Sequence, residues 1–220
     1  MYLIFKRILD IFFSTLAVFL LSPVLILIIV VLKFSAEGEV FYLQERVGFK
    51  NKNFMIFKFA TMIKNSPNIG TGDVTLRNDP RVTKIGKLLR ETKLNEIPQL
   101  FNILKGDISI IGPRPLMKVG FKRYSIKYQN TIYNIKPGLT GIGSIVFRDE
   151  EKILTESNLN PHECYKKIIL PYKGELEIWY QNNINIFLDF KLVFLTGWTI
   201  LFPNSKLYEK WLKNLPKRKF

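Results

Sequence analysis

The sequence predicts an α+β fold that is mainly helical, with short strands, a kinked N-terminal membrane helix and interfacial amphipathic helices. Three observations favour this class. Residues 11–32 form an uncharged apolar run long enough for a membrane helix. The later apolar segments are shorter and alternate with polar turns. The 220-residue chain is 47% hydrophobic yet carries a formal net charge of +15, which indicates one domain, with or without an appendage, beside an anionic partner.

An apolar and basic chain fits an anionic membrane surface, a phosphate-bearing substrate, or both. Nucleic acid is a competing partner, but no zinc-finger, basic-zipper or RNA-binding signature is present, and the apolar N-terminus argues against it. The single cysteine, Cys164, excludes an intramolecular disulfide and fits a reducing compartment. His162 is the only histidine, so neither a histidine metal cluster nor a Ser-His-Asp triad is expected.

Ser22 and Pro23 lie at the centre of the apolar run. Proline removes a backbone N–H and clashes with the preceding turn, so a kink is expected at this hinge. A straight helix over the run would just span a bilayer at about 1.5 Å per residue. Because Lys6 and Arg7 precede it and Lys33 follows it, the charge bias does not favour opposite sides. A re-entrant helix that returns to the same face and a kinked helix that spans the membrane both stay open.

Residues 93–111 combine a helix signal with a strand signal. Asn95 is the expected N-cap of a helix, with Glu96 in the first turn at the positive end of the helix dipole. Gly106 is expected to end the helix, and residues 108–111 indicate a short buried strand.

Arg114 lies between two prolines, which restrict the backbone on both sides of it. Its planar guanidinium is therefore aimed, and it suits a phosphate or a carboxylate. The alternative is a structural ion pair beside a capped helix.

Patterns elsewhere predict further elements. These are two strands at 40–43 and 54–57 joined by the polar turn 48–53, an amphipathic helix over 119–133, a strand over 142–147, a helix starting at Asn160-Pro161, a helix over 170–182, an apolar segment at 192–202 that is too short to span, and an amphipathic tail after Pro203.

A basic helix capped near Thr83 is also expected, and it could be a solvated face, rest on lipid or cover a pyrophosphate. Its basic residues are Arg81, Lys84, Lys87, Arg90 and Lys93.

The ordered set of motifs resembles the bacterial sugar transferases, the monotopic phosphoglycosyl transferases that begin glycoconjugate assembly. The motifs are Lys6-Arg7-x-x-Asp10, Ser22-Pro23, Gln44-x-Arg46-x-Gly48, Lys58-Phe59-x-Thr61-Met62, Glu96-Ile-Pro-Gln-Leu100, Asn102-Ile-Leu-Lys-Gly-Asp107, Gly112-Pro-Arg-Pro115, Lys136-Pro-Gly-Leu-Thr-Gly141 and Asp189-Phe-Lys-Leu192. They cover almost the whole chain. Each one alone is weak, and the ordered set is specific.

The resemblance implies transfer of a sugar 1-phosphate from a UDP-sugar to polyprenyl phosphate, with Mg²⁺, on the cytoplasmic face of the bacterial inner membrane. It favours the re-entrant helix and implies three parts: a membrane anchor over 1–36 hinged at Ser22-Pro23, a cytoplasmic transferase domain over 37–203, and a basic amphipathic tail over 204–220. The expected partners are the UDP-sugar, polyprenyl phosphate and anionic membrane lipid, without nucleic acid, and a homodimer is a candidate assembly.

Asn95 departs from the family, which usually has an aspartate nucleophile there, followed by glutamate. A neutral amide is a poor nucleophile and a weaker magnesium ligand than a carboxylate. Glu96 could supply the nucleophile, a direct transfer could bypass a covalent step, or the chain could be a binding or scaffold subunit of a glycan-assembly complex. Further departures are Ala60, where a basic residue is common, and the segment after Gly141.

The resemblance and the local chemistry assign roles to seven residues. Glu96, Asn95 and Asp107 are the candidate catalytic residues, Glu96 and Asp107 are the candidate Mg²⁺ ligands, and Arg114, Arg90, Lys58 and Arg148 are the candidate phosphate and substrate ligands. Asp107 could alternatively orient Arg114 or cap the following turn.

Overall fold

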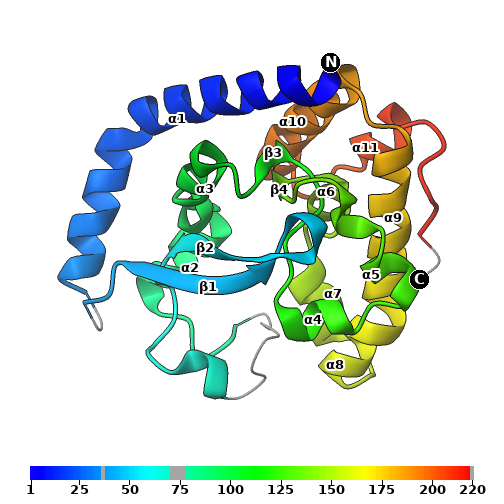
Figure 1. Cartoon of the computed structure of the whole chain (residues 1–220). Coiled ribbons are helices and arrows are strands. Elements are labelled where there is room, and N and C mark those ends of the chain that lie inside the picture. Colours follow the sequence, from blue (N-terminus) through cyan, green and yellow to red (C-terminus); the bar gives the residue numbers. More distant parts are fainter. Residues whose placement is uncertain (36–37, 70–77, 219–220) are drawn as a thin grey trace.

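The computed structural model describes residues 1–35, 38–69 and 78–218 (Figure 1). The expected boundary between residues 36 and 37 lies outside these ranges, as do the last two residues of the expected tail. The described chain is mainly helical with short strands, which confirms the predicted class.

The helices are α1 (Tyr2–Lys33), α2 (Lys84–Glu91), α3 (Gln99–Lys105), α4 (Lys118–Lys122), α5 (Ile126–Gln129), α6 (Ile142–Val146), α7 (Glu150–Glu156), α8 (Pro161–Cys164), α9 (Leu170–Asn182), α10 (Ile186–Leu201) and α11 (Leu207–Trp211). The strands are β1 (Phe41–Val47), β2 (Asn53–Phe59), β3 (Ser109–Ile111) and β4 (Gly138–Thr140). β1 and β2 form an antiparallel hairpin, and β3 and β4 form a parallel pair.

Helix α1 bends along its length, and Pro23 lies inside it (Figure 1). Pro23 has no N–H to donate to the carbonyl of Phe19, four residues earlier. The hydroxyl of Ser22 donates to that carbonyl instead, at 2.8 Å. The Ser-Pro pair therefore breaks the helical hydrogen-bond ladder and satisfies the exposed oxygen, so the predicted kink is confirmed.

The first half of α1 is bound to the rest of the domain by polar contacts. Arg7 donates to the carbonyls of Ile103 and Leu104 at the end of α3, at 2.5 and 2.8 Å. Asp10 is buried and accepts from the main-chain N–H of Ile110 in β3, at 3.0 Å. A cation at a helix C-terminus is favourable, so these contacts fix α3 and β3 beneath α1.

Asp189 in α10 forms a second junction with the start of α1. Its carboxylate accepts from the hydroxyls of Tyr2 and Tyr180, both at 2.6 Å, and from the ammonium of Lys6 at 2.7 Å. The aspartate is buried, so the three donors offset the loss of its hydration. This junction joins the N-terminus of the chain to the C-terminal helices.

The second half of α1 packs on a different part of the same domain. Leu25, Ile28 and Leu32 form a buried cluster with Phe59 of β2 and Leu89 of α2. Most other large side chains of α1 are exposed, and α1 is the one helix among the described residues that is long and apolar enough to cross a membrane.

The main hydrophobic core lies between the helices that follow β3, with α6 and α9 packed together at its centre. Tyr208 and Leu212 of the C-terminal tail belong to this core, so the tail packs on the domain. In α10, Leu192 and Leu195 are buried, whereas Phe190 and Phe194 are exposed, so the helix has apolar side chains both in the core and on the surface.

Several local predictions are confirmed. The hydroxyl of Thr83 caps α2 by accepting from the N–H of Gly86 at 2.9 Å, Gly106 ends α3 with φ 93°, and the side chain of Asn160 caps α8. The hairpin and the helix over 170–182 also form as expected. Arg81 does not share an exposed basic face with the other four predicted basic residues. Its side chain is buried and forms an ion pair with Asp79 at 2.6 Å.

Two of the predicted secondary-structure elements are wrong. Residues 119–133 do not form one helix, because extended backbone at Ser125 separates α4 from α5, and this lets Phe121, Tyr124 and Tyr133 all reach the core. The expected strand over 142–147 is instead α6, which is buried on nearly every side. A short run that is apolar at almost every position has no periodicity to distinguish the two structures.

Candidate active site

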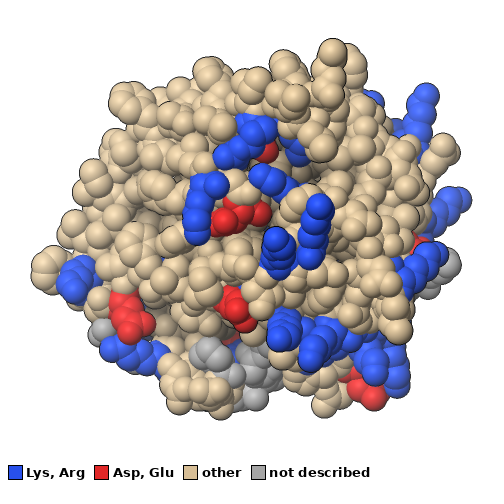
Figure 2. All heavy atoms as spheres, viewed as in Figure 1, with Lys and Arg blue, Asp and Glu red and all other residues tan. Residues whose placement is uncertain are grey.

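A cavity of about 1780 Å³ opens beside the β1–β2 hairpin and extends between α2, α6, α7 and α9. Figure 2 shows lysine and arginine side chains around a hollow on this face, with acidic side chains within it. The basic residues that line the cavity include Lys58, Lys64, Lys84, Lys87, Arg90, Lys93, Arg114 and Arg148. The cavity therefore favours an anionic ligand.

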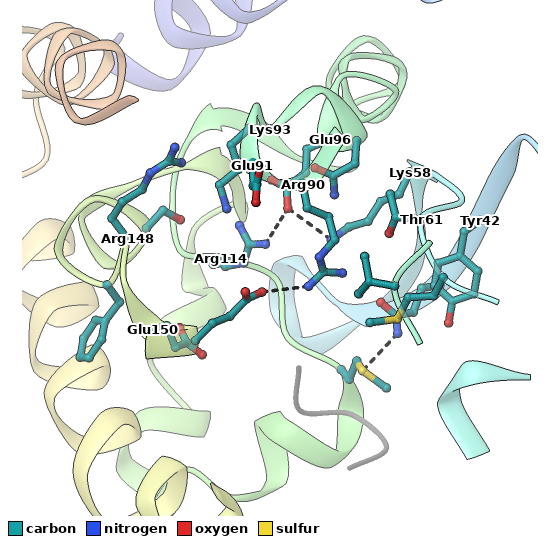
Figure 3. Close-up of a pocket in the computed structure, with 18 of the residues that line it drawn as sticks. Tyr42, Lys58, Thr61, Arg90, Glu91, Lys93, Glu96, Arg114, Arg148 and Glu150 are labelled. Atoms are coloured by element: carbon teal, nitrogen blue, oxygen red, sulfur yellow. Dashed lines mark hydrogen bonds and ion pairs between the residues drawn. The ribbon is translucent and has the colours of Figure 1, made fainter. Parts of the chain in front are cut away.

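Glu96 lies at the centre of these cations. Its Oε1 accepts from Nη2 of Arg114 at 2.7 Å and lies 3.4 Å from Nζ of Lys58 (Figure 3). The side chains of Glu96 and Lys58 are 13% and 16% exposed, whereas that of Arg114 is 38% exposed. The structure therefore brings together three of the predicted site residues, and Arg114 remains open to a ligand.

The charges of the three groups are strongly coupled. Burial would raise the pKa of Glu96, but Arg114 and Lys58 hold that pKa well below its ordinary value. The attraction of Glu96 raises the pKa of Arg114. Burial, helped by the charge of Arg114, lowers the pKa of Lys58 to about 7 despite the attraction of Glu96. Glu96 is therefore ionised near neutral pH.

A tight turn before α3 brings Glu96 into the cavity. Lys93 adopts φ 61°, in the left-handed region, and a 3₁₀ turn over Leu94–Glu96 follows. The expectation that Asn95 is an N-cap is wrong, because α3 begins three residues after the 3₁₀ turn and no side chain caps it. The Asn95 side chain is buried, and its Oδ1 has no hydrogen-bond partner among the described residues.

Arg114 is positioned by a tyrosine as well as by its prolines. The hydroxyl of Tyr133 donates to the carbonyl of Arg114 and accepts from the N–H of Leu116, both at 2.9 Å. At the start of the same loop, a Cβ on Gly112 would lie 2.4 Å from the carbonyl oxygen of Lys136, so only glycine allows the two chains to approach. Tyr133 is buried and fixes the loop on the main core.

The other predicted cations lie around the cavity in Figure 3. Arg90 of α2 pairs with Glu151 of α7 at 2.9 Å, so a phosphate would compete with Glu151 for it. Arg148 follows α6, and burial lowers its pKa, as it does that of Lys93. The negative charge of Glu96 opposes both decreases in pKa.

Asp107 does not lie with the other predicted catalytic residues. It follows α3, whereas Glu96 precedes it, which separates them by roughly 10 Å for a seven-residue helix at 1.5 Å per residue. Asp107 accepts from Nδ2 of Asn102 at 3.0 Å. Asn102 also binds β2 through the carbonyl of Met55 and the N–H of Phe57, at 2.7 and 2.9 Å. Asp107 thus orients the residue that holds the strand carrying Lys58.

Asp107 is not among the residues that line the cavity, whereas Glu96 is, so the structure does not place the two expected Mg²⁺ ligands around one ion. No group of three or more His, Cys, Asp or Glu side chains suited to a metal occurs in the described parts of the chain. Oε1 of Glu96 is held by cations, which leaves its Oε2 and the Oδ1 of Asn95 as oxygen ligands. Such a set fits Mg²⁺ only together with the phosphate oxygens of a substrate, a mode that this ion commonly adopts.

The sequence did not indicate three residues of this region as site residues. Arg46 donates to the carbonyl of Pro115 at 3.3 Å and to the side chain of Gln44, so it supports the arginine loop from β1. Glu177 lines the cavity from α9, and Tyr133 lies behind Arg114. Arg46 could have been found from the Gln44-x-Arg46-x-Gly48 motif, whereas Glu177 and Tyr133 carry no local signal.

The chemistry follows from this geometry. A diphosphate in the cavity would meet Arg114, Lys58 and the surrounding cations, which can stabilise charge that develops on a leaving phosphate. Glu96 is an ionised carboxylate at the same point, and a carboxylate can attack phosphorus or hold a metal ion. The arrangement therefore suits phosphoryl transfer.

Comparison with known proteins agrees with this chemistry. The chain is 33% identical over 91% of its length to the UDP-N-acetylgalactosamine-undecaprenyl-phosphate N-acetylgalactosaminephosphotransferase of Aeromonas hydrophila, of which it covers 44%. It is 35% identical over 88% of its length to the UDP-glucose:undecaprenyl-phosphate glucose-1-phosphate transferase of Klebsiella pneumoniae, of which it covers 39%. The chain thus spans less than half the length of these relatives.

A shorter relative is covered more fully. The chain is 30% identical over 87% of its length to the exopolysaccharide production protein ExoY of Rhizobium meliloti, of which it covers 83%. The model of the family described as "Bacterial sugar transferase" matches residues 1–203. The match therefore includes both the bent helix α1 and the cluster around Glu96, and the chain belongs to the bacterial sugar transferase family.

Proposed function

We propose that the protein transfers a sugar 1-phosphate from a UDP-sugar to polyprenyl phosphate and releases UMP, as the first step of a surface polysaccharide or glycoconjugate. The observation that carries this proposal is the ionised Glu96 held by Arg114 and Lys58 inside a cationic cavity. Two relatives are named as transferases of a sugar phosphate to undecaprenyl phosphate, which supports the same substrates here.

In this mechanism Arg114 and Lys58 bind the diphosphate and stabilise the charge that shifts onto UMP as it leaves. Mg²⁺, when bound with the diphosphate, would neutralise part of the charge on the phosphate oxygens. Two routes are compatible with this site. Either the free carboxylate oxygen of Glu96 attacks the β-phosphorus and the polyprenyl phosphate then takes the phosphosugar, or the polyprenyl phosphate attacks directly.

UMP release across a panel of UDP-sugars, with polyprenyl phosphate present, tests the activity. Intact-protein mass after mixing with the UDP-sugar alone separates the routes. A phosphosugar adduct that is lost in Glu96→Gln supports attack by Glu96, and UMP release without an adduct supports direct transfer. Wild-type protein that releases no UMP with any sugar of the panel would contradict the proposal.

We further propose that α1 is re-entrant and that both of its ends lie on the cytoplasmic face of the inner membrane. The first half of α1 contacts α3 and β3, and the second half packs on β2 and α2 of the same domain. A single folded domain lies on one side of a membrane, so this packing supports a hairpin. The exposed apolar side chains of α1 and α10 would enter the lipid, and the basic surface would face anionic headgroups.

Cysteine labelling tests the topology. In a Cys164→Ser background, we expect Met1→Cys and Ser35→Cys to react with an impermeant reagent from the same side of inverted membrane vesicles. Labelling of the two positions from opposite sides would exclude the re-entrant arrangement. A covalent cross-linking experiment in the same membranes would test the homodimer.

A further inference from the structure

The cavity continues past Arg114 into a polar chamber between α6, α7 and α9. We call this the inner chamber and define it by Ser144, Glu150, Tyr165, Lys173 and Glu177, all of which line the cavity. Neither the phosphate-binding cations nor α1 contributes to this definition. The inner chamber has no role in the steps described above.

The inner chamber holds polar atoms that lack partners. Oγ of Ser144 and Oε2 of Glu177 are buried and have no hydrogen-bond partner among the described residues. Glu177 as a whole is only 4% exposed. Buried polar atoms in folded proteins are usually hydrogen-bonded, so two such atoms in residues that line one cavity indicate a polar occupant.

The chemistry of the inner chamber suits a neutral ligand. Lys173 is paired with Glu150, and its ammonium also lies 5.4 Å from the centre of the Tyr165 ring, so its charge is already compensated. Burial raises the pKa of Glu177 to about 7, so about half of these carboxyl groups are protonated and neutral at pH 7. A carboxyl and a hydroxyl both accept and donate hydrogen bonds, as the hydroxyls of a sugar require.

The position of the inner chamber also matches a sugar. The main-chain N–H groups of Arg114 and Gly143 stabilise the carboxylate of Glu177, which therefore lies directly behind the arginine that holds Glu96. In Figure 3, Glu150 and Arg148 lie on one side of the Glu96–Arg114 pair, and Tyr42 and Thr61 lie on the other. A group attached to the reacting phosphate can thus extend into the inner chamber.

Other parts of the cavity lining are apolar. They include Ala17 and Leu21 of α1, the candidate membrane helix, and Ile200 of α10. An apolar lipid chain does not suit the inner chamber, because its hydrocarbon would leave the buried polar atoms there without partners.

We propose that the inner chamber is the subsite for the sugar ring of the nucleotide sugar, and that Ser144 and Glu177 bind its hydroxyl groups and contribute to the choice of sugar. This inference rests on the proposed function, since it places the sugar beside the phosphate that is transferred.

The test compares Ser144→Ala and Glu177→Gln with Ser109→Ala. Ser109 is a matched control, because its Oγ is also buried without a described partner but its residue does not line the cavity. The measurements are kcat/KM for two UDP-sugars that differ at one hydroxyl, and the inhibition constant of UDP, which lacks the sugar. Thermal unfolding in detergent shows whether each variant is folded.

We expect Ser144→Ala and Glu177→Gln to lower kcat/KM for the better UDP-sugar by about 3- to 10-fold, the usual effect of one lost neutral hydrogen bond, and to change the ratio between the two sugars. The inhibition constant of UDP should stay within about twofold of the wild-type value, and Ser109→Ala should change none of these quantities. If the inhibition constant of UDP rises by the same factor as kcat/KM for the UDP-sugars falls, or if Ser144→Ala behaves as Ser109→Ala does, the assignment is wrong.

Failure of the proposed function has a different signature. In that case the wild-type protein releases no UMP, and the comparison is made instead by the calorimetric affinities of UDP and UDP-sugars. Affinity of the wild type that is equal for UDP and every UDP-sugar, and unchanged in Ser144→Ala, would overturn the sugar subsite by itself.

Discussion

Arg114 is the side chain whose removal should affect transfer most clearly. It donates to Glu96 at 2.7 Å, and it is the more exposed member of the pair, so it can bind the diphosphate without leaving the carboxylate. Arg114→Ala removes one charged donor from the transferred phosphate. Loss of a comparable donor lowers kcat by about 10²- to 10³-fold in enzymes that stabilise an oxyanion. We expect a loss of at least 10²-fold here.

The same substitution should change how the remaining groups titrate. Arg114 lowers the pKa values of both Glu96 and Lys58, so without it both values should rise. UMP release, measured from pH 5 to 9 at saturating UDP-sugar, should therefore shift its acid limb to higher pH in the variant. Arg114→Lys keeps a charge but loses the planar fork, and it should recover only part of the activity.

A control variant separates this effect from a general loss of positive charge. Lys105→Ala also removes a cation, but Lys105 pairs with Asp107 outside the cavity and its side chain is 66% exposed. This variant should retain near-normal turnover. Arg114→Ala with near-normal turnover, or an equal loss in Lys105→Ala, would refute the role of Arg114.

Three further predictions follow from individual side chains. Tyr133→Phe should lower the free energy of unfolding by about 1–3 kcal/mol and reduce turnover, because the buried carbonyl and N–H that bind its hydroxyl lose their partner. Denaturant unfolding and UMP release in the same detergent measure both effects. Unchanged stability would contradict the role of the Tyr133 hydroxyl in holding the arginine loop. Asn95→Asp should raise the rate of UMP release, because a carboxylate can attack phosphorus where an amide cannot; peptide mapping of any phosphosugar adduct checks its position, and an unchanged rate would show that position 95 does not limit the chemistry. The folded-state pKa of Glu177, about 7, lies above its unfolded value of 4.5, so the folded protein binds more protons between these two pH values. The free energy of unfolding should therefore fall by roughly 3 kcal/mol as the pH rises through that range. Unfolding at several pH values should show this loss in the wild type and not in Glu177→Gln, and the same pH dependence in both proteins would contradict the burial of this carboxyl.

The local signals in the sequence were reliable where a few neighbouring residues determine the structure. Thr83 caps α2, Gly106 ends α3 and Asn160 caps α8, because each depends on hydrogen bonds or backbone angles within one turn. The prediction for Asn95 had the same form and was wrong. Its side chain is buried beside the cavity, and the preceding left-handed residue Lys93 changes the direction of the chain before α3 begins.

These local signals did not predict contacts between distant segments of the chain. Asp107 shares a motif with α3, and only the folded chain shows that it orients Asn102 against β2 instead of meeting Glu96. Tyr133 follows Arg114 by 19 residues, and nothing around it marks a hydroxyl that will hold the arginine loop. Glu177 lies in a helix whose pattern indicates only burial, and the partners of its carboxyl come from the segments of Arg114 and Gly143.

The sequence by itself determined the long apolar N-terminal helix with its Ser22-Pro23 break, the mainly helical class and the motifs that mark the family, because these are properties of composition, periodicity and residue order. Only the tertiary structure decided which charged groups share the cavity. Glu96, Lys58 and Arg114 come from three segments, and their meeting depends on packing of α3 against β2 and on the position of the arginine loop. Packing of that kind is a sum of many weak contacts over the whole chain, so it is not encoded at any single position.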